Sequence, residues 1–144
     1  MSVMSVKGVG IDTVHLPSFR DQLADPASRF VAMTFTPAEQ ALAEGRPDKN
    51  PARHLAARFA AKEAFLKAWS GARWGKNPTA QSSDLRDIEV VCDAWDRPRL
   101  VLHGAVAAAL AEAAPRGFDL QLSLSHDGDQ AMAMVVLSAP EELR

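Results

Sequence analysis

Half of the cationic side chains in this sequence gather in one short stretch, residues 46–76. The whole chain has sixteen lysines and arginines and a formal net charge of -2, yet this stretch holds eight of those cations and only two acids. At its centre Arg58, Lys62 and Lys67 flank Glu63. A single carboxylate among several cations is typical of a site for a metal-bound, multiply charged phosphate.

The same residues also allow a purely structural interpretation. In a helix, Arg58 and Lys62 lie one turn apart, and so do Glu63 and Lys67. An exposed Glu63–Lys67 pair would contribute only about 0.3–0.5 kcal/mol, and charged helix faces are usually solvated. Without further evidence, the residues alone favour this second interpretation.

Two further candidates lie outside the basic stretch. Asp12 follows Gly8-Val9-Gly10-Ile11, where an acid either binds a metal or ends a strand. The glycine pair lacks the third glycine of a dinucleotide fingerprint, so a Rossmann site is excluded. His126, beside Ser125 in a predicted turn, is more often a turn residue than a catalyst.

The elements that must position these residues follow from turn and capping signals. β-branched residues and two glycines predict a strand over 6–14 that passes close to other backbone. Thr36, the proline after it and Glu39 form a predicted capping box at the start of a helix. Asn50-Pro51 begins a long helix that we expect to end at Ser70-Gly71.

The remaining segments complete one α+β unit, a single domain over 1–144. A loop over 72–83 is long enough to close over a ligand. The other expected elements are a helix over 17–24, hairpin strands over 87–93 and 99–102, a helix over 103–114, and a final strand pair over 118–125 and 130–137.

Composition excludes several classes of protein. With 47% hydrophobic and 24% charged residues, the chain is globular rather than disordered or a coiled coil. Its apolar runs are far shorter than the roughly 20 residues of a membrane span, and the first residues do not resemble a secretory signal. We therefore expect a cytoplasmic protein with no membrane segment. The single cysteine, Cys92, excludes an internal disulfide, and the interleaved aromatic residues of a nucleic-acid binder are missing.

Four motifs together resemble those of the holo-acyl-carrier-protein synthases, the small phosphopantetheinyl transferases. In chain order they are Gly8-Val9-Gly10-Ile11-Asp12, Arg58-Phe59-Ala60-Ala61-Lys62-Glu63-Ala64, Asp96-Arg97-Pro98 and Leu124-Ser125-His126-Asp127. The resemblance covers residues 6–137, and the runs 54–71 and 87–104 are most similar to actinobacterial members. It implies the 4'-phosphopantetheinyl transferase fold: a small antiparallel sheet packed on a long helix, with active sites at the subunit interfaces of a homotrimer.

The resemblance also implies roles for single residues. Asp12 and Glu63 match the carboxylates that bind magnesium together with the pyrophosphate of coenzyme A, and magnesium commonly takes one or two protein carboxylates. Lys62 and Lys67 match the lysines assigned to the phosphates, while Glu63 or a water that it orients is the implied base. The positions that match a nucleotide pocket contributed by a neighbouring subunit are Arg58, Pro98, Ser125 and His126.

The reaction implied is attack by a serine hydroxyl of an acyl carrier protein on the β-phosphate of coenzyme A. The phosphopantetheine arm moves to the serine and adenosine 3',5'-bisphosphate leaves. Similarity to actinobacterial members further implies a carrier domain of a type I fatty acid synthase as the partner. Two alternatives stay open: a noncatalytic module that binds coenzyme A or a carrier, and a magnesium-dependent nucleotide pyrophosphatase.

Overall fold

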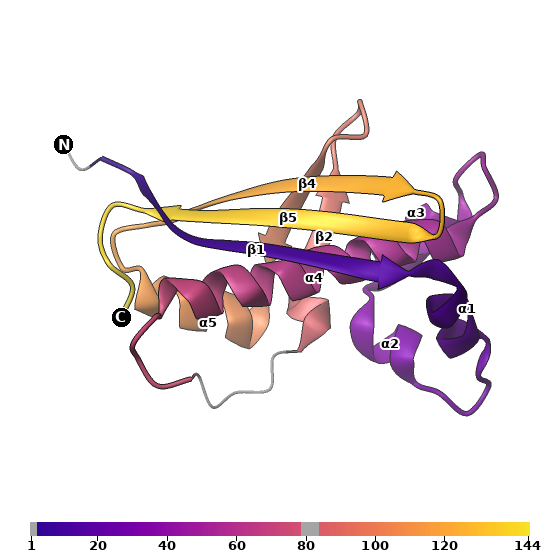
Figure 1. The fold of residues 1–144 in the computed structure, drawn as a ribbon, viewed down its shortest axis with the longest axis horizontal. Helices are drawn as coiled ribbons and strands as arrows, with labels where there is room; N and C mark the ends of the chain where they lie inside the picture. The colour runs from indigo at the N-terminus through magenta and orange to yellow at the C-terminus, as the bar shows by residue number, and fades with distance from the viewer. Residues whose placement is uncertain (1–2, 79–83) are drawn as a thin grey trace.

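A long central helix lies against one face of a three-stranded sheet in the computed structural model (Figure 1). The structure describes residues 3–78 and 84–144. The elements in chain order are β1 (Ser5–His15), α1 (Leu16–Ala24), α2 (Phe30–Thr34), α3 (Pro37–Glu44), α4 (Pro51–Ala72), the short 3-10 helix η1 (Leu85–Asp87), β2 (Ile88–Cys92), β3 (Pro98–Leu102), α5 (Gly104–Ala113), β4 (Asp119–Asp127) and β5 (Gln130–Ala139).

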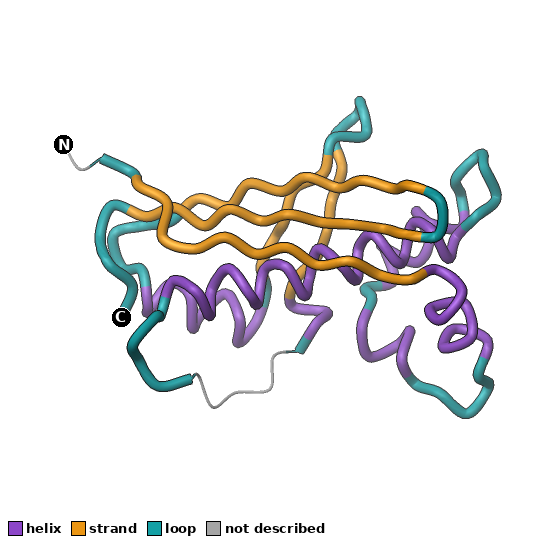
Figure 2. Tube along the Cα trace, viewed as in Figure 1, coloured by secondary structure: helices purple, strands orange, loops and turns teal. Residues whose placement is uncertain are grey.

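The strands form two separate antiparallel sheets. β5 is the central strand of the larger sheet and pairs with β1 on one side and with β4 on the other. β2 and β3 form a hairpin that contacts β4 through β3, and its turn projects away from the body of the molecule (Figure 2). The expected α+β fold, with a small antiparallel sheet packed on a long helix, is confirmed.

Small side chains allow β1 and α4 to approach closely. A Cβ at Gly8 would lie 1.9 Å from the carbonyl oxygen of Ala68, and a Cβ at Gly10 would lie 1.8 Å from that of Ala64. No side chain larger than hydrogen fits at these distances, which confirms the predicted close backbone contact. The core between sheet and helix is completed by buried residues of β5, namely Ala131, Ala133, Val135 and Leu137.

Three local predictions differ from the structure. The long helix continues through Ser70-Gly71 to Ala72, and the space around Gly71 is open, because a Cβ there would meet no atom within 4 Å beyond the neighbouring backbone of its own helix. α2 has no counterpart among the predicted elements, since it depends on distant contacts such as the ring packing of Phe30 on Phe19 and Phe59. β4 runs on to Asp127, so His126 belongs to a strand and not to a turn.

The loop predicted over 72–83 is described only in part. Residue 72 belongs to α4, and residues 79–83 lie outside the described residues. Within the part of the chain that is described, no helix is long and apolar enough to cross a membrane.

Candidate active site

Two acids that are about fifty residues apart in the sequence meet where β1 lies on α4. Asp12 lies on β1, and the ammonium group of Lys67 donates to its Oδ1 at 2.9 Å. Lys67 also donates to the carbonyl oxygen of Ile11 at 2.9 Å. Glu63 precedes Lys67 by one helical turn, so β1 and α4 bring Asp12, Glu63 and Lys67 together. We call these three residues the carboxylate–lysine group.

The electrostatics of the carboxylate–lysine group favour a divalent cation. Burial, followed by the nearby negative charge of Asp12, raises the pKa of Glu63 above its ordinary value, while Lys67 acts in the opposite direction. A divalent cation between the two carboxylates would relieve this repulsion, and carboxylate oxygens are the hard ligands that magnesium prefers. The residues present therefore fit a magnesium ion.

The protein would leave most of the coordination sphere of such an ion to other ligands. Among the described residues, no group of three or more His, Cys, Asp or Glu side chains is placed to hold a metal. Magnesium usually keeps several waters or substrate phosphate oxygens beside one or two carboxylates. A site with two carboxylates thus suits a metal that arrives with a phosphate-bearing substrate.

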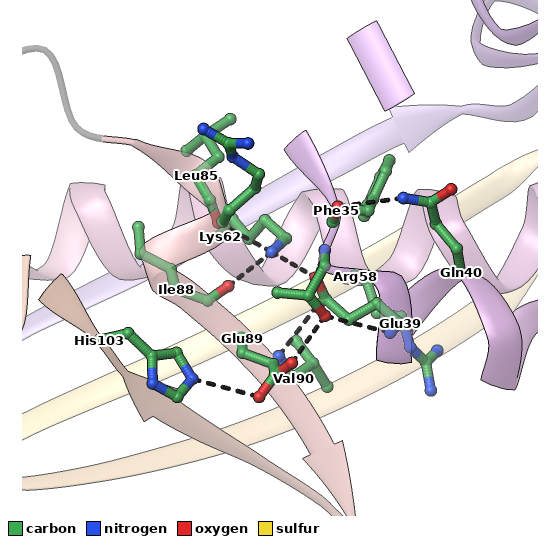
Figure 3. Close-up of polar contacts among 12 residues, drawn as sticks. Phe35, Glu39, Gln40, Arg58, Lys62, Leu85, Ile88, Glu89, Val90 and His103 are labelled. Carbon is green, nitrogen blue, oxygen red and sulfur yellow. Dashed lines mark hydrogen bonds and ion pairs between the residues drawn. The ribbon is translucent and has the colours of Figure 1, made fainter. Parts of the chain in front are cut away.

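Lys62 is predicted from the sequence to contact phosphate, but its side chain points elsewhere (Figure 3). Its side chain is fully buried, and its ammonium group donates to Glu39 at 2.8 Å, to the Leu85 carbonyl at 2.9 Å and to the Ile88 carbonyl at 2.6 Å. A lysine has three N–H donors, so none is left for a phosphate in this structure. The solvated-face interpretation of the helix is wrong for Lys62, because the residue lies in the core.

The sequence predicts Glu39 only as a capping residue, and its contact with Lys62 was missed. Its predicted capping box with Thr36 is present, with the Thr36 hydroxyl accepting from the Glu39 amide and the Glu39 carboxylate accepting from the Thr36 amide. The same carboxylate also pairs with Lys62 and accepts from the Val90 amide at 3.0 Å. A capping glutamate is ordinarily exposed, so its complete burial has no local signal in the sequence.

A second group of candidate residues lies around the first half of α4. Arg58 is 3% exposed and donates to the His54 carbonyl at 3.1 Å and to the Cys92 sulfur at 3.7 Å. The Nε2 atom of His126 lies 3.3 Å from the Arg53 carbonyl, and the His54 and His126 rings are 6.2 Å apart. These four residues, Arg53, His54, Arg58 and His126, are called the arginine–histidine group below.

The arginine–histidine group creates a positive environment. Burial lowers the pKa of His126, the contact with the Arg53 carbonyl opposes that shift, and the positive charges of Arg53, His54 and Arg58 lower the pKa further. An anion bound here would reverse those repulsions. Arg53 and His54 belong to the basic stretch of the sequence, but their spacing gives no reason to single them out.

The other two predicted residues of the nucleotide pocket lie nearby on strands. Ser125 is exposed on β4, and its side chain points to the opposite face of the sheet from that of His126. Pro98 begins β3 and lines a cavity of about 540 Å³ together with Val91, Cys92, Asp93, Arg97 and Arg99. Because Arg58 contacts Cys92, this cavity adjoins the arginine–histidine group.

The candidate site is thus divided into two parts within one chain. Asp12 on β1 contacts Lys67 of α4, whereas His126 on β4, the opposite outer strand of the sheet, lies beside Arg53 and His54. One part offers carboxylates and a lysine for a metal and a phosphate. The other offers guanidinium and imidazole groups for an anion.

Comparisons with known proteins place this geometry in a family. The profile of the 4'-phosphopantetheinyl transferase superfamily matches residues 8–135. The holo-[acyl-carrier-protein] synthase of Mycobacterium tuberculosis is 47% identical over 137 residues, covering 95% of this chain and all of that protein.

Solved structures agree with the sequence comparison. The ACPS–CoA complex of Chronobacterium ammoniagenes has a TM-score of 0.84 and 44% identity, covering 95% of this chain and 98% of that one. The acyl carrier protein synthase of Mycobacterium tuberculosis has a TM-score of 0.72 and 45% identity, covering 94% and 100%. The chain belongs to the 4'-phosphopantetheinyl transferase superfamily and is an enzyme of that class. The chain is similar to mycobacterial holo-acyl-carrier-protein synthases, which agrees with the resemblance to actinobacterial members.

Proposed function

We propose that this transferase is a holo-acyl-carrier-protein synthase that moves 4'-phosphopantetheine from coenzyme A to a serine of an apo acyl carrier protein. The serine oxygen forms a new bond to the β-phosphorus of coenzyme A, and the bond from that phosphorus to the bridging pyrophosphate oxygen breaks. Adenosine 3',5'-bisphosphate leaves with the electron pair of the broken bond. The observation that carries this proposal is the meeting of Asp12, Glu63 and Lys67 where β1 lies on α4.

In this proposal the carboxylate–lysine group binds the pyrophosphate. A magnesium ion held by Asp12 and Glu63 would supply positive charge to offset the charge of the phosphates. Lys67 uses two of its three N–H donors on Asp12 and Ile11 within the described residues, which leaves a donor for a phosphate oxygen. Its side chain is 55% exposed and therefore accessible to a substrate.

Glu63 is the candidate for removing the proton of the attacking serine, either directly or through a water that it orients. A general base works best when its pKa lies near the working pH, and the raised pKa of Glu63 moves it in that direction. Both routes stay open.

The arginine–histidine group, with Pro98 and Ser125, is proposed to bind the nucleotide half of coenzyme A for a neighbouring subunit. Guanidinium groups recognise phosphate with directed N–H donors, which suits a nucleotide that carries several phosphates. Because Asp12 and His126 lie on the two outer strands of the sheet, β1 and β4, a complete site would form between two copies in a homotrimer. Support for self-association comes from exposed apolar residues on the sheet, Val9, Ile11, Met132 and Met134, which are 52%, 54%, 39% and 43% exposed.

The two alternatives are less well supported. A noncatalytic module that binds coenzyme A or a carrier would have no need for two acids that repel each other beside a lysine. A magnesium-dependent pyrophosphatase would need the same metal group, but the relatives in the comparison are named as synthases that act on acyl carrier protein. A carrier domain of a type I fatty acid synthase as partner, a cytoplasmic location and a single domain stay predictions.

The proposal is tested by incubating the protein with coenzyme A, magnesium and a panel of apo carrier proteins and domains, then weighing each intact carrier by mass spectrometry. A gain of about 340 Da that disappears with a chelator supports metal-assisted transfer and names the carrier. Unmodified carriers with tightly bound coenzyme A would favour the binding module. Cleaved coenzyme A without carrier modification would favour the pyrophosphatase.

A further inference from the structure

The buried ion pair between Glu39 and Lys62 does more than fill space in the core. Both side chains are 0% exposed, and Nζ lies 2.8 Å from Oε1. Removing two charges from water is costly, and apolar residues of similar volume often replace such a pair with no loss of stability. Stability alone is therefore a weak explanation for this pair.

All the partners that the pair requires are present. Besides Glu39, Lys62 binds the carbonyls of Leu85 in η1 and Ile88 in β2. Besides Lys62, Glu39 binds the amides of Thr36 and Val90. A fully satisfied buried network holds its members in one arrangement. This one hydrogen-bond network therefore fixes α3, α4 and the start of β2 relative to each other (Figure 3).

The network of Glu39 and Lys62 lies directly beside the carboxylate–lysine group. Lys62 precedes Glu63, and successive helical residues point about 100° apart around the axis. When Lys62 is held in the network, the direction of Glu63 is set as well. A rotation of α4 that released Lys62 would also move Glu63 relative to Asp12.

We propose that Glu39 is a positioning residue of the transferase, which acts through Lys62 to fix the rotation of α4 that places Glu63 beside Asp12. In this arrangement both side chains are fully buried, and Lys62 has no N–H donor left for a substrate. The inference rests on the proposed function, because the geometry it protects is that of the metal-binding carboxylates.

The test begins with Glu39→Gln, compared with Glu44→Gln as a control at an exposed position of the same helix. Glutamine keeps the volume but has one carbonyl oxygen for three donors and no charge to pair with Lys62. We expect Glu39→Gln to lower kcat for carrier modification about tenfold or more, since small misplacements of catalytic groups have such effects. We also expect it to raise the magnesium concentration for half-maximal thermal stabilisation about threefold or more. The control should match wild type in both measurements.

A double variant separates positioning from stability. Glu39→Leu combined with Lys62→Met removes both charges and leaves neither unpaired, so it should unfold at a higher temperature than Glu39→Gln, although the backbone groups of Thr36, Val90, Leu85 and Ile88 lose their side-chain partners. We expect the double variant to keep the low kcat and the weakened magnesium response. Recovery of both to wild-type values together with stability would overturn the proposal, and so would a wild-type magnesium response in folded Glu39→Gln.

The two proposals fail in different ways. If wild type modifies a carrier and Glu39→Gln does so equally well, the positioning role is wrong and the proposed function stands. If wild type modifies no carrier at all, the proposed function fails, while the magnesium-dependent unfolding temperature still decides the role of Glu39.

Discussion

At the scale of single residues, the carboxylates of Asp12 and Glu63 repel each other, and Lys67 offsets part of that repulsion. Burial and the charge of Asp12 raise the pKa of Glu63, so the ionised Glu63 is less favourable in the folded chain than in the unfolded chain. A group whose folded pKa is raised favours folding at low pH and loses that contribution as pH rises through the folded pKa. At neutral pH, Glu63 therefore costs stability that binding of a divalent cation would return.

Removing the charge of Glu63 should raise the stability of the protein and lower its activity. Glu63→Gln should unfold about 2 °C above wild type at pH 7 without magnesium, because the buried repulsion is gone and shifts of this size need less than about 1 kcal/mol. The difference should shrink as pH falls toward the ordinary carboxyl range. Thermal unfolding across pH, with and without magnesium, measures both effects.

Glu44→Gln is the matched control, since Glu44 is exposed on α3. Its unfolding temperature should follow wild type at every pH and keep the rise caused by magnesium. Glu63→Gln should lose that rise and most carrier modification. A full magnesium response in Glu63→Gln would remove this residue from the metal site.

At the scale of elements, the site depends on how closely β1 packs on α4. A Cβ at position 10 would lie 1.8 Å from the Ala64 carbonyl oxygen and 2.8 Å from the Ala68 nitrogen, both of them backbone atoms that cannot turn aside. Asp12 follows two residues later on the same strand. Glycine at position 10 therefore controls both the packing and the placing of Asp12, the proposed metal ligand.

Gly10→Ala tests this dependence. The strand must move away from the helix, so we expect a loss of about 1–3 kcal/mol in the free energy of unfolding and a larger fractional loss of carrier modification, because Asp12 moves with the strand. Gly71→Ala is the control: a Cβ at this position would meet no atom within 4 Å beyond the neighbouring backbone of its own helix, and alanine favours helix, so its stability should equal or exceed that of wild type. Denaturant unfolding measures the stabilities. Equal unfolding of Gly10→Ala and wild type would contradict the close packing.

The same elements show which features of the structure could be predicted from the sequence and which could not. The glycine pair and the Thr36 capping box are local signals with one physical meaning, and the structure confirms both. The burial of Lys62 depends on Glu39 and on the carbonyls of two other elements, which no local pattern reveals. Gly128 close after His126 favours a turn at the histidine, yet a tight two-residue turn leaves His126 within β4.

At the scale of the whole molecule, α4 covers one face of the sheet and the other face carries exposed apolar residues. Ile11 on β1 pairs with Met134 on β5, and Met132 follows on the same side. Apolar neighbours of this kind on a sheet usually mark an interface. A second copy of the chain is the occupant that the proposed shared site requires.

A charge in this face should separate the copies. Met134→Lys places a cation at the centre of the outward face, and we expect it to lower the mass measured by light scattering to that of one chain and to abolish carrier modification. Gln22→Lys, at an exposed position on α1, makes a similar change in charge away from the sheet and should keep both the assembly and the activity. An active monomer of Met134→Lys would contradict the shared site.

Subunit mixing decides whether a complete site combines the two groups from neighbouring copies. Glu63→Ala and His126→Ala proteins should each be inactive, and after full exchange at equal amounts about one quarter of all sites, one in each mixed trimer, would combine two intact halves. We expect recovery of about one quarter of wild-type carrier modification, and no recovery from a mixture of Glu63→Ala with Asp12→Ala. If exchange is demonstrated and the first mixture stays inactive, each site belongs to a single chain and the shared site is wrong.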